Sequence, residues 1–283
     1  MKIKKAGYLL ALLPFVFIAL MFEAAPLVTV VVRSFMPAGQ AGFTLQNYAD
    51  IFTKKLYRDA VFNSVVLSLL SSLAGPLVAF FAAKAAHSRG GRLGRFFTSL
   101  LNMTSNFAGV PLTFSYIILL GNTGVLVLLG KQLGIQTLAG YDVYSFSGLL
   151  RVYIYFPVPL ATILLIPAFD AIRGEWREAA SLLGGGSVTF WRRVGLPVLL
   201  PSLLGTLSIL FSNAIAAYAT AYALLGGNYS LLPIRISEQF TGDIVQRKEF
   251  GSALAVVLML LMVVATLVNH AIVKNRKGGG DNA

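Results

Sequence analysis

The residues best suited to chemistry lie in one hydrophilic segment, Asp170 to Pro197, which reads DAIRGEWREAASLLGGGSVTFWRRVGLP. Good helix formers run up to Leu183, and the glycines from Gly184 to Gly186 stop a helix there. Ser187 is suited to cap a second helix. The segment therefore predicts a helix, a glycine turn and another helix.

The first of these helices offers a surface for another protein. Ala179 and Ala180 leave a shallow helix face, and Glu178 and neighbouring arginines border it with charge. Small side chains let a partner approach closely, and the charged groups supply ionic contacts. We expect this segment to fit into a groove of a partner protein.

Enzyme chemistry finds little support elsewhere in the chain. There are no cysteines, and the apolar runs lack the paired carboxylates and histidines that hydrolysis or a metal site would use. The stretch GVLVLLGKQ from Gly124 has the wrong spacing for a phosphate-binding loop, and a glutamine follows its lysine. We expect no catalytic residue, no metal and no cofactor.

The elements that must position this segment are membrane spans. Only 12% of the 283 residues are charged, and the mean hydropathy is +0.76. A spanning helix needs about 20 apolar residues, and six runs reach that length. The runs are Tyr8–Val32, Val61–Ala83, Phe96–Leu120, Ser145–Phe169, Leu196–Leu225 and Phe250–Val273. The fold class is therefore an all-α integral membrane protein with six spans.

Basic residues set the orientation of these spans. The side that holds both termini, Lys84–Arg95 and the 170–197 segment carries 14 of the 23 lysines and arginines, so we place it in the cytoplasm. The net charge of +12 is then a signal of topology, and we expect no nucleic-acid partner. Outside, the sequence VLVLL predicts a short helix that does not span. Prolines recur within the runs and predict kinked helices.

The 170–197 segment resembles the EAA loop of ATP-binding-cassette (ABC) importer permeases. That motif has E-A-A, three residues, glycine, nine residues, isoleucine, one residue and Leu-Pro. Here the matching residues are Glu178, Ala179, Ala180, Gly184, Val194, Leu196 and Pro197, with valine in place of isoleucine. A second Glu-Ala-Ala begins at Glu23, but it lies within a span and lacks the glycine. TLQNYADIF and LLGGNYSLLPIRI are similar to the branch that includes polyamine, ferric iron, thiamine and phosphonate importers.

The resemblance implies a single permease domain over residues 1–283, with its core at about 61–273 and a cytoplasmic coupling helix in the loop 170–197. It also implies a multi-pass protein of the bacterial inner membrane, in contact with lipid. The implied partners are a dimer of ABC ATPase subunits that hydrolyse ATP, a second permease, identical or related, and an extracytoplasmic solute-binding protein. The implied activity is import of a small solute.

The solute pathway is less clearly marked. Asn213 and Tyr218 in the fifth run are the pathway candidates, and Glu23 is a third. Polar side chains within spans also serve to bond neighbouring helices. The alternative function is a secondary transporter or channel that works alone. Such a protein needs ionisable residues deep in several spans, whereas this chain offers only the peripheral Glu23 and His270.

Overall fold

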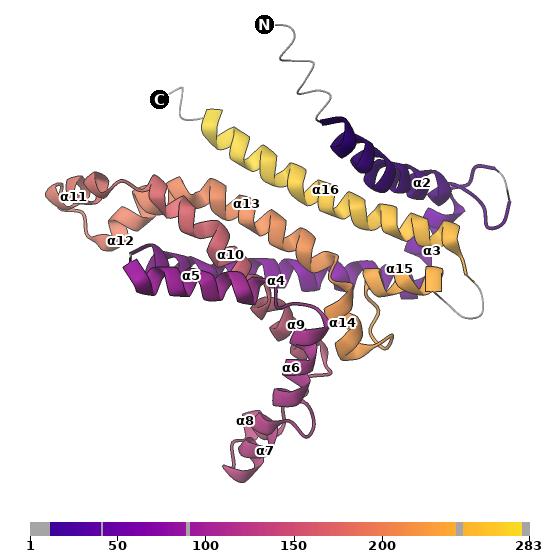
Figure 1. Cartoon of the computed structure of the whole chain (residues 1–283), viewed down its shortest axis with the longest axis horizontal. Helices are drawn as coiled ribbons and strands as arrows, with labels where there is room; N and C mark the ends of the chain where they lie inside the picture. Colours follow the sequence, from indigo (N-terminus) through magenta and orange to yellow (C-terminus); the bar gives the residue numbers. More distant parts are fainter. Residues whose placement is uncertain (1–11, 41, 89–90, 242–245, 279–283) are drawn as a thin grey trace, which may run out of the picture.

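The computed structural model describes residues 12–40, 42–88, 91–241 and 246–278. This part of the chain is helical and contains no strand (Figure 1). The start of the first predicted run, at Tyr8, lies outside the described residues. The helices are η1 (Leu20–Ala24), α2 (Ala25–Ser34), α3 (Gln46–Thr53), α4 (Lys55–Ser88), α5 (Gly91–Ser105), α6 (Val110–Leu120), α7 (Val125–Gln132), α8 (Gln136–Ala139), α9 (Phe146–Tyr155), α10 (Pro157–Leu165), η2 (Ile166–Ala171), α11 (Gly174–Leu182), α12 (Ser187–Phe190), η3 (Trp191–Gly195), α13 (Leu196–Ile215), α14 (Tyr218–Leu225), α15 (Leu232–Thr241) and α16 (Lys248–Gly278).

Among the described residues, six helical stretches are long and apolar enough to cross a membrane, which confirms the predicted number of spans. They are Leu12–Ser34, Lys55–Ser88, Val110–Gln132, Phe146–Ala171, Ser187–Ile215 and Lys248–Lys274. The prolines have different effects on these helices. Pro76 and Pro201 lie within continuous helices, whereas Pro111 and Pro157 lie in the first turn of new ones.

The prediction of one continuous span over Phe96–Leu120 is wrong. The helix ends at Ser105, and α6 begins only at Val110. Gly109 has a φ of 71°, outside the helical region, and Pro111 cannot donate a backbone hydrogen bond. These residues break the run. A short helix is present around VLVLL as α7, but it falls within the candidate span Val110–Gln132, so its predicted place outside the membrane stays a prediction. Together with α6 and α8 it forms an arm that projects away from the bundle (Figure 1).

The fifth predicted run, Leu196–Leu225, is also divided. Helix α13 ends at Ile215 and α14 begins at Tyr218, because Ala217 leaves the helical region with a ψ of 84°. The Tyr153 hydroxyl donates a hydrogen bond of 2.6 Å to the Ala217 carbonyl. This bond satisfies a backbone group that the break would otherwise leave without a partner.

The long helices α4, α13 and α16 and the shorter α10 lie alongside one another and form the bundle (Figure 1). Helices α11 and α12 form one end of it, and α3 and α15 lie at the opposite end. The first span packs on the outer side of α16. Buried side chains form three clusters along the bundle, and the one nearest α12 joins α4, α10 and α13.

Asp50 ties α3 to the segment before α16. Its carboxylate accepts hydrogen bonds from Lys54 and, at 2.9 Å, from Gln46, and Arg247 lies 3.7 Å away. The bond from Lys54 outweighs the effect of burial and lowers the pKa of Asp50 below its ordinary value of 3.8. A lowered pKa in the folded state stabilises the fold above the ordinary pKa, and this stabilisation is lost as the pH falls through the folded pKa.

We expect Asp50→Asn to lower the melting temperature of the detergent-solubilised protein at pH 7 by about 2 °C. The difference in melting temperature between the variant and the parent chain should be smaller at pH 3, because protonation of Asp50 then weakens its ion pairs in the parent chain. Thermal unfolding followed by circular dichroism at both pH values measures this. Asp59→Asn is the control, since Asp59 takes part in none of the ion pairs among the described residues. An equal difference at both pH values would contradict the prediction.

Candidate functional site

Helix α11 ends in a glycine turn, as its sequence predicts. The Gly184 N–H donates to the Ser181 carbonyl at 3.0 Å, and the Gly185 N–H donates to the Ala180 carbonyl at 2.8 Å. Gly184 has a φ of 75°, a conformation that side chains disfavour. A Cβ on Gly185 would lie 2.8 Å from the Ala180 carbonyl oxygen. The turn therefore requires glycine at two successive positions.

The predicted cap at Ser187 is wrong in its detail. Helix α12 does begin at Ser187, but the N-cap residue is Gly186, and no side chain accepts a hydrogen bond there. The predicted order of helix, turn and helix is confirmed. We call the resulting structure, residues 174–190, the docking tip.

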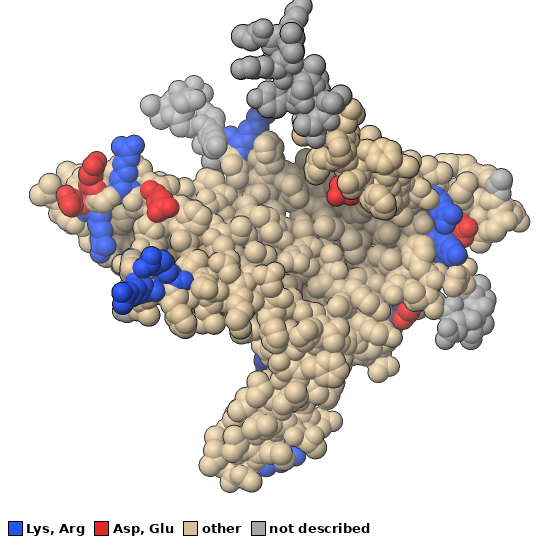
Figure 2. Space-filling model, viewed as in Figure 1, with Lys and Arg blue, Asp and Glu red and all other residues tan. Residues whose placement is uncertain are grey.

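The docking tip exposes large apolar side chains at its extremity. Leu182 is 90% exposed, Leu183 is 89% exposed and Val188 is 81% exposed. Charged side chains surround these residues, and Figure 2 shows acidic and basic groups gathered at this end of the molecule. Neighbouring exposed apolar groups with a charged border are typical of a surface that another protein covers.

The EAA residues lie on this tip. Glu178 and Ala179 are exposed, and Ala180 is half-buried. Glu178 takes part in none of the ion pairs among the described residues, so its carboxylate is available to a partner. Beside α12, a cleft of about 310 Å³ is lined by Val188, Thr189, Arg192 and Arg193. Its two arginines suit it to an acidic group.

Four aromatic side chains hold the docking tip on the bundle. They are Phe80 of α4, Phe169 of η2, Phe190 of α12 and Trp191 of η3, and we call them the aromatic joint. The Trp191 ring lies 5.8 Å from Phe80 and 6.3 Å from Phe169, between ring centroids. Lys84 Nζ lies 4.4 Å from the centre of the Trp191 ring, within reach of a cation–π interaction. The joint connects the tip with α4 and with the start of the loop.

Gly195 makes room for this arrangement. A Cβ at Gly195 would lie 2.5 Å from Cε3 of Trp191, so only glycine fits under the indole. The residues between them form a π-helical turn, η3, closed by the Leu196 N–H donating to the Trp191 carbonyl. Pro197 follows directly and cannot donate to the carbonyl four residues before it. Val194 is half-buried within the turn, and Leu196 is 43% exposed beside it.

His87 and Asp170 form a further contact between α4 and the loop. His87 Nδ1 lies 3.3 Å from Asp170 Oδ1, and the imidazole stacks on Phe169 with 5.9 Å between ring centroids. The loop is therefore anchored where it begins, at Asp170, and where it returns to the bundle, at Trp191.

The three pathway candidates do not come together in one site. Asn213 is exposed on α13, and Tyr218 begins α14 beyond the break. Tyr218 stacks on Tyr222 with 5.1 Å between ring centroids. Glu23 is exposed on η1, in the span on the outer side of α16 (Figure 1).

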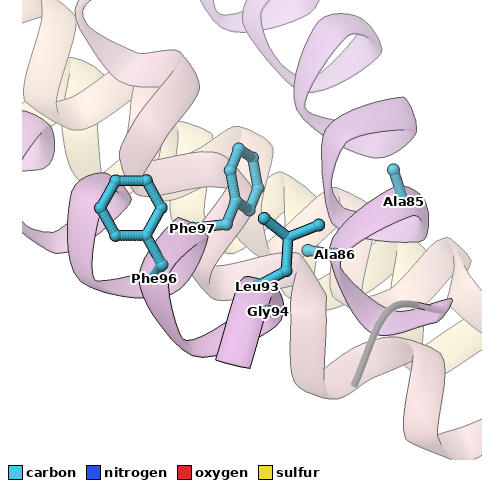
Figure 3. Close-up of a pocket in the computed structure, with 6 residues that line it drawn as sticks. All are labelled: Ala85, Ala86, Leu93, Gly94, Phe96 and Phe97. Carbon is cyan, nitrogen blue, oxygen red and sulfur yellow. The ribbon is translucent and has the colours of Figure 1, made fainter. Parts of the chain in front are cut away.

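An apolar cleft of about 340 Å³ lies between the end of α4 and the start of α5 (Figure 3). Its lining residues are Ala85, Ala86, Leu93, Gly94, Phe96 and Phe97. None of these side chains carries a polar group, so the cleft suits an acyl chain or an apolar helix face and offers nothing to orient a polar solute.

The sequence analysis did not identify the aromatic joint or the exposed leucines. The pairing of Trp191 with Gly195 four residues later was a usable signal, because residues four apart share a helix face. The exposure of Leu182 and Leu183 had no such signal, since apolar residues next to a helix end are commonly buried.

The family described as binding-protein-dependent transport system inner membrane component matches residues 75–278. The thiamine transport system permease protein ThiP of Brucella melitensis is 28% identical over 235 residues, which is 82% of this chain and 41% of that protein. The chain thus spans about two fifths of the length of this relative. The spermidine/putrescine permease protein PotC of Haemophilus influenzae is 22% identical over 254 residues, with 88% of this chain and 92% of that protein covered.

Solved structures share the fold. A crystal structure of a bacterial ABC transporter that imports alginate has a TM-score of 0.73 at 18% identity, covering 96% of this chain and 98% of the other. An inward-facing methionine ABC transporter, MetNI, has a TM-score of 0.56 at 16% identity, covering 77% and 94%. At these identities the likeness concerns the fold alone.

Proposed function

Because this chain belongs to the family of binding-protein-dependent transport system inner membrane components, we propose that it is the membrane-spanning permease subunit of an ATP-driven importer. The observation that carries the proposal is the docking tip, which exposes Leu182 and Leu183 beyond the end of the apolar bundle and is fixed on it by the aromatic joint. Exposure of neighbouring apolar side chains to water is unfavourable, and a partner that covers them removes that cost.

The proposed partners follow from this assignment. A dimer of ABC ATPase subunits covers the docking tip on the cytoplasmic side, with both chain termini on that side too. A second permease, identical or related, completes the pathway, and an extracytoplasmic binding protein delivers the solute. The alginate importer has been solved in complex with an alginate-bound periplasmic protein, and it shares this fold. ATP hydrolysis belongs to the ATPase, so the chain itself is not an enzyme in this proposal.

Coupling in this proposal is mechanical. Movement of the ATPase subunits displaces the docking tip, and the aromatic joint passes the displacement to α4 and η2. The turn η3 passes it directly to α13. Packed aromatic rings transmit a displacement because close-packed interiors deform little. The matching residues Gly184, Val194, Leu196 and Pro197 keep the tip at a fixed angle, and Glu178 makes a polar contact with the ATPase.

Asn213 and Tyr218 remain pathway proposals. Both lie next to the break between α13 and α14, and a broken helix of this kind places polar backbone groups where a solute passes. Glu23 lies on the first span, which packs mainly on α16. We therefore assign Glu23 to the surroundings of this outer span and not to the solute pathway.

The competing proposal, a secondary transporter that works alone, gains nothing from the placement of its residues. Glu23 and His270 are both exposed on the outside of their helices, whereas ion coupling needs ionisable groups inside the bundle. Such a transporter also has no use for an exposed apolar docking tip.

Co-purification tests the proposed function. Co-expressed with its candidate ABC ATPase subunit, the tagged parent chain should retain the ATPase in detergent. Glu178→Arg should weaken this association about thirtyfold, because a charged contact at an interface contributes roughly 2 kcal/mol. Asp59→Arg makes the same charge reversal near the start of α4, at the end of that helix away from the docking tip. This control should leave the association with the ATPase unchanged. If the parent chain retains no ATPase yet moves solute down an ion gradient, the chain is a secondary transporter.

A further inference from the structure

Helix α9 exposes a polar face within a membrane span. Its exposed residues are Ser147, Arg151 and Tyr155, which follow one another at intervals of four and therefore lie on one side of the helix. Leu149, Val152 and Tyr153, on the opposite side of the helix, are buried in the core. Arg151 is the sixth residue of the candidate span Phe146–Ala171, about 8 Å along the helix from its start.

Arg151 has an aromatic neighbour and no acidic one. Its guanidinium lies 4.7 Å from the centre of the Tyr141 ring. None of the ion pairs and side-chain hydrogen bonds in the described part of the chain involves Arg151. The Tyr141 hydroxyl is buried and likewise has no hydrogen-bond partner. Beside them, Tyr116 and Tyr155 meet edge to face, with 5.9 Å between ring centroids. The guanidinium donors are thus available to a ligand.

The face of α9 differs from the lipid-facing surface of the same protein. On α4 the exposed residues include Phe62, Leu69, Leu73 and Leu77, as expected of side chains in contact with acyl chains. An arginine that faces lipid costs about 2.5–3.5 kcal/mol at the centre of a span on insertion scales, and less toward the end of a span, where Arg151 lies. A row of serine, arginine and tyrosine is therefore better suited to a water-filled pathway than to lipid.

A second polar row lies on α5. Its members are all exposed and occur at helical spacing: Arg92, Arg95, Ser99 and Asn102. An adjacent row on the same helix is apolar and includes Leu93 and Phe96, two of the residues in Figure 3. Helix α5 thus presents a polar row beside an apolar one.

A cleft of about 560 Å³ lies along the polar row of α5. Arg95, Ser99 and Asn102 line it, together with His87 at the end of α4. Both polar rows carry basic side chains, and neither contains a carboxylate. Arg92 and Arg95 also fit the bias of cytoplasmic ends toward basic residues, so the inference rests on Arg151, which lies in the outer half of its span.

We propose that Arg151 binds an oxyanion group of the transported solute, such as a carboxylate, phosphate or phosphonate, against the aromatic surface of Tyr141, Tyr116 and Tyr155. A guanidinium forms paired hydrogen bonds with such groups. That the site lies on a solute pathway rests on the proposed function. The chain would then import an anion, whereas polyamines and thiamine are cations. A phospholipid headgroup offers the same phosphate chemistry, and the experiment separates the two sources.

The test uses a single cysteine in this naturally cysteine-free chain. In Ser147→Cys, reconstituted in nanodiscs, we would measure the reaction rates of an anionic sulfonatoethyl and a cationic trimethylammonioethyl methanethiosulfonate. The ratio of the anionic to the cationic reaction rate should fall about fivefold in Arg151→Gln, because the nearby positive charge is removed. In Arg151→Lys, which keeps the charge, the ratio should stay as it is with Arg151. At the control position Leu133→Cys on the arm, Arg151→Gln should leave the ratio unchanged.

Inorganic phosphate and methylphosphonate should slow the reaction of Ser147→Cys, and spermidine should not. The protection should be equal in nanodiscs of phosphatidylcholine and of a phosphate-free glycolipid. If added phosphate slowed the reaction only in the glycolipid nanodiscs, phospholipid headgroups would already occupy Arg151 in the phosphatidylcholine nanodiscs. That result overturns the proposal. Absence of reaction, an unchanged rate ratio or absence of protection would overturn it as well. None of these results depends on ATPase binding, so failure of the proposed function would be seen separately in the co-purification.

Discussion

Replacing Leu182 and Leu183 together by aspartate is expected to abolish co-purification of the ATPase. Both side chains are almost fully exposed, so their burial by a partner would contribute roughly 2 kcal/mol each. Losing about 4 kcal/mol weakens binding roughly a thousandfold, beyond what detergent purification tolerates. The double variant should fold and insert as the parent does, because neither side chain packs against the bundle.

The matched control is Leu133→Asp. Leu133 is 69% exposed, similar in type to the tip leucines, but it lies on the arm, which the proposed topology places outside the cell. This variant should retain the ATPase. If the double variant, with both Leu182 and Leu183 replaced by aspartate, retained as much ATPase as the control, the docking tip would not be the contact surface. Circular dichroism and gel filtration establish that both variants are folded.

Gly195→Ala is expected to damage the aromatic joint by adding a single methyl group. The added Cβ would lie 2.5 Å from Cε3 and 2.9 Å from Cζ3 of Trp191. The indole has little room to move, because Phe80, Phe169 and Phe190 surround it. Overpacking of this kind costs about 2 kcal/mol. We expect a lower melting temperature and, in the complex, ATP hydrolysis that continues while solute transport falls about tenfold.

Two further variants identify the cause. Gly205→Ala adds the same methyl group to α13 where nothing lies within 4 Å, so stability and transport should be retained. Trp191→Ala combined with Gly195→Ala removes the indole that causes the clash, so the two destabilisations should not add. If Gly195→Ala leaves both the melting temperature and the transport-to-hydrolysis ratio unchanged, Trp191 does not act as a rigid connection.

The sequence alone predicted the membrane class, the six spans and the helix–turn–helix of the docking tip. These features depend on local information. An uncharged run of about 20 residues must form a helix in lipid, and Gly184 and Gly185 end α11 through hydrogen bonds to carbonyls within five residues. Such signals do not depend on which other helices are near.

Other features were decided by the tertiary structure. Gly109 and Pro111 divide the third run. Ala217 breaks the fifth run, where the Tyr153 hydroxyl donates a hydrogen bond to the Ala217 carbonyl. Hydropathy averages cannot detect such breaks, because the residues at the breaks are uncharged and their neighbours are apolar. The aromatic joint gathers residues far apart in the chain, Phe80, Phe169 and Trp191, and its need for glycine at 195 arises only from that packing.

The sequence of this protein by itself predicted which segments are apolar enough to enter the membrane and which one we propose to meet a partner, because both predictions follow from polarity and from hydrogen bonds within a turn. The tertiary structure decided which side chains on those segments remain exposed. The roles proposed for Arg151 and for the leucines of the docking tip depend on the exposure of their side chains. That exposure depends on how the helices pack on one another.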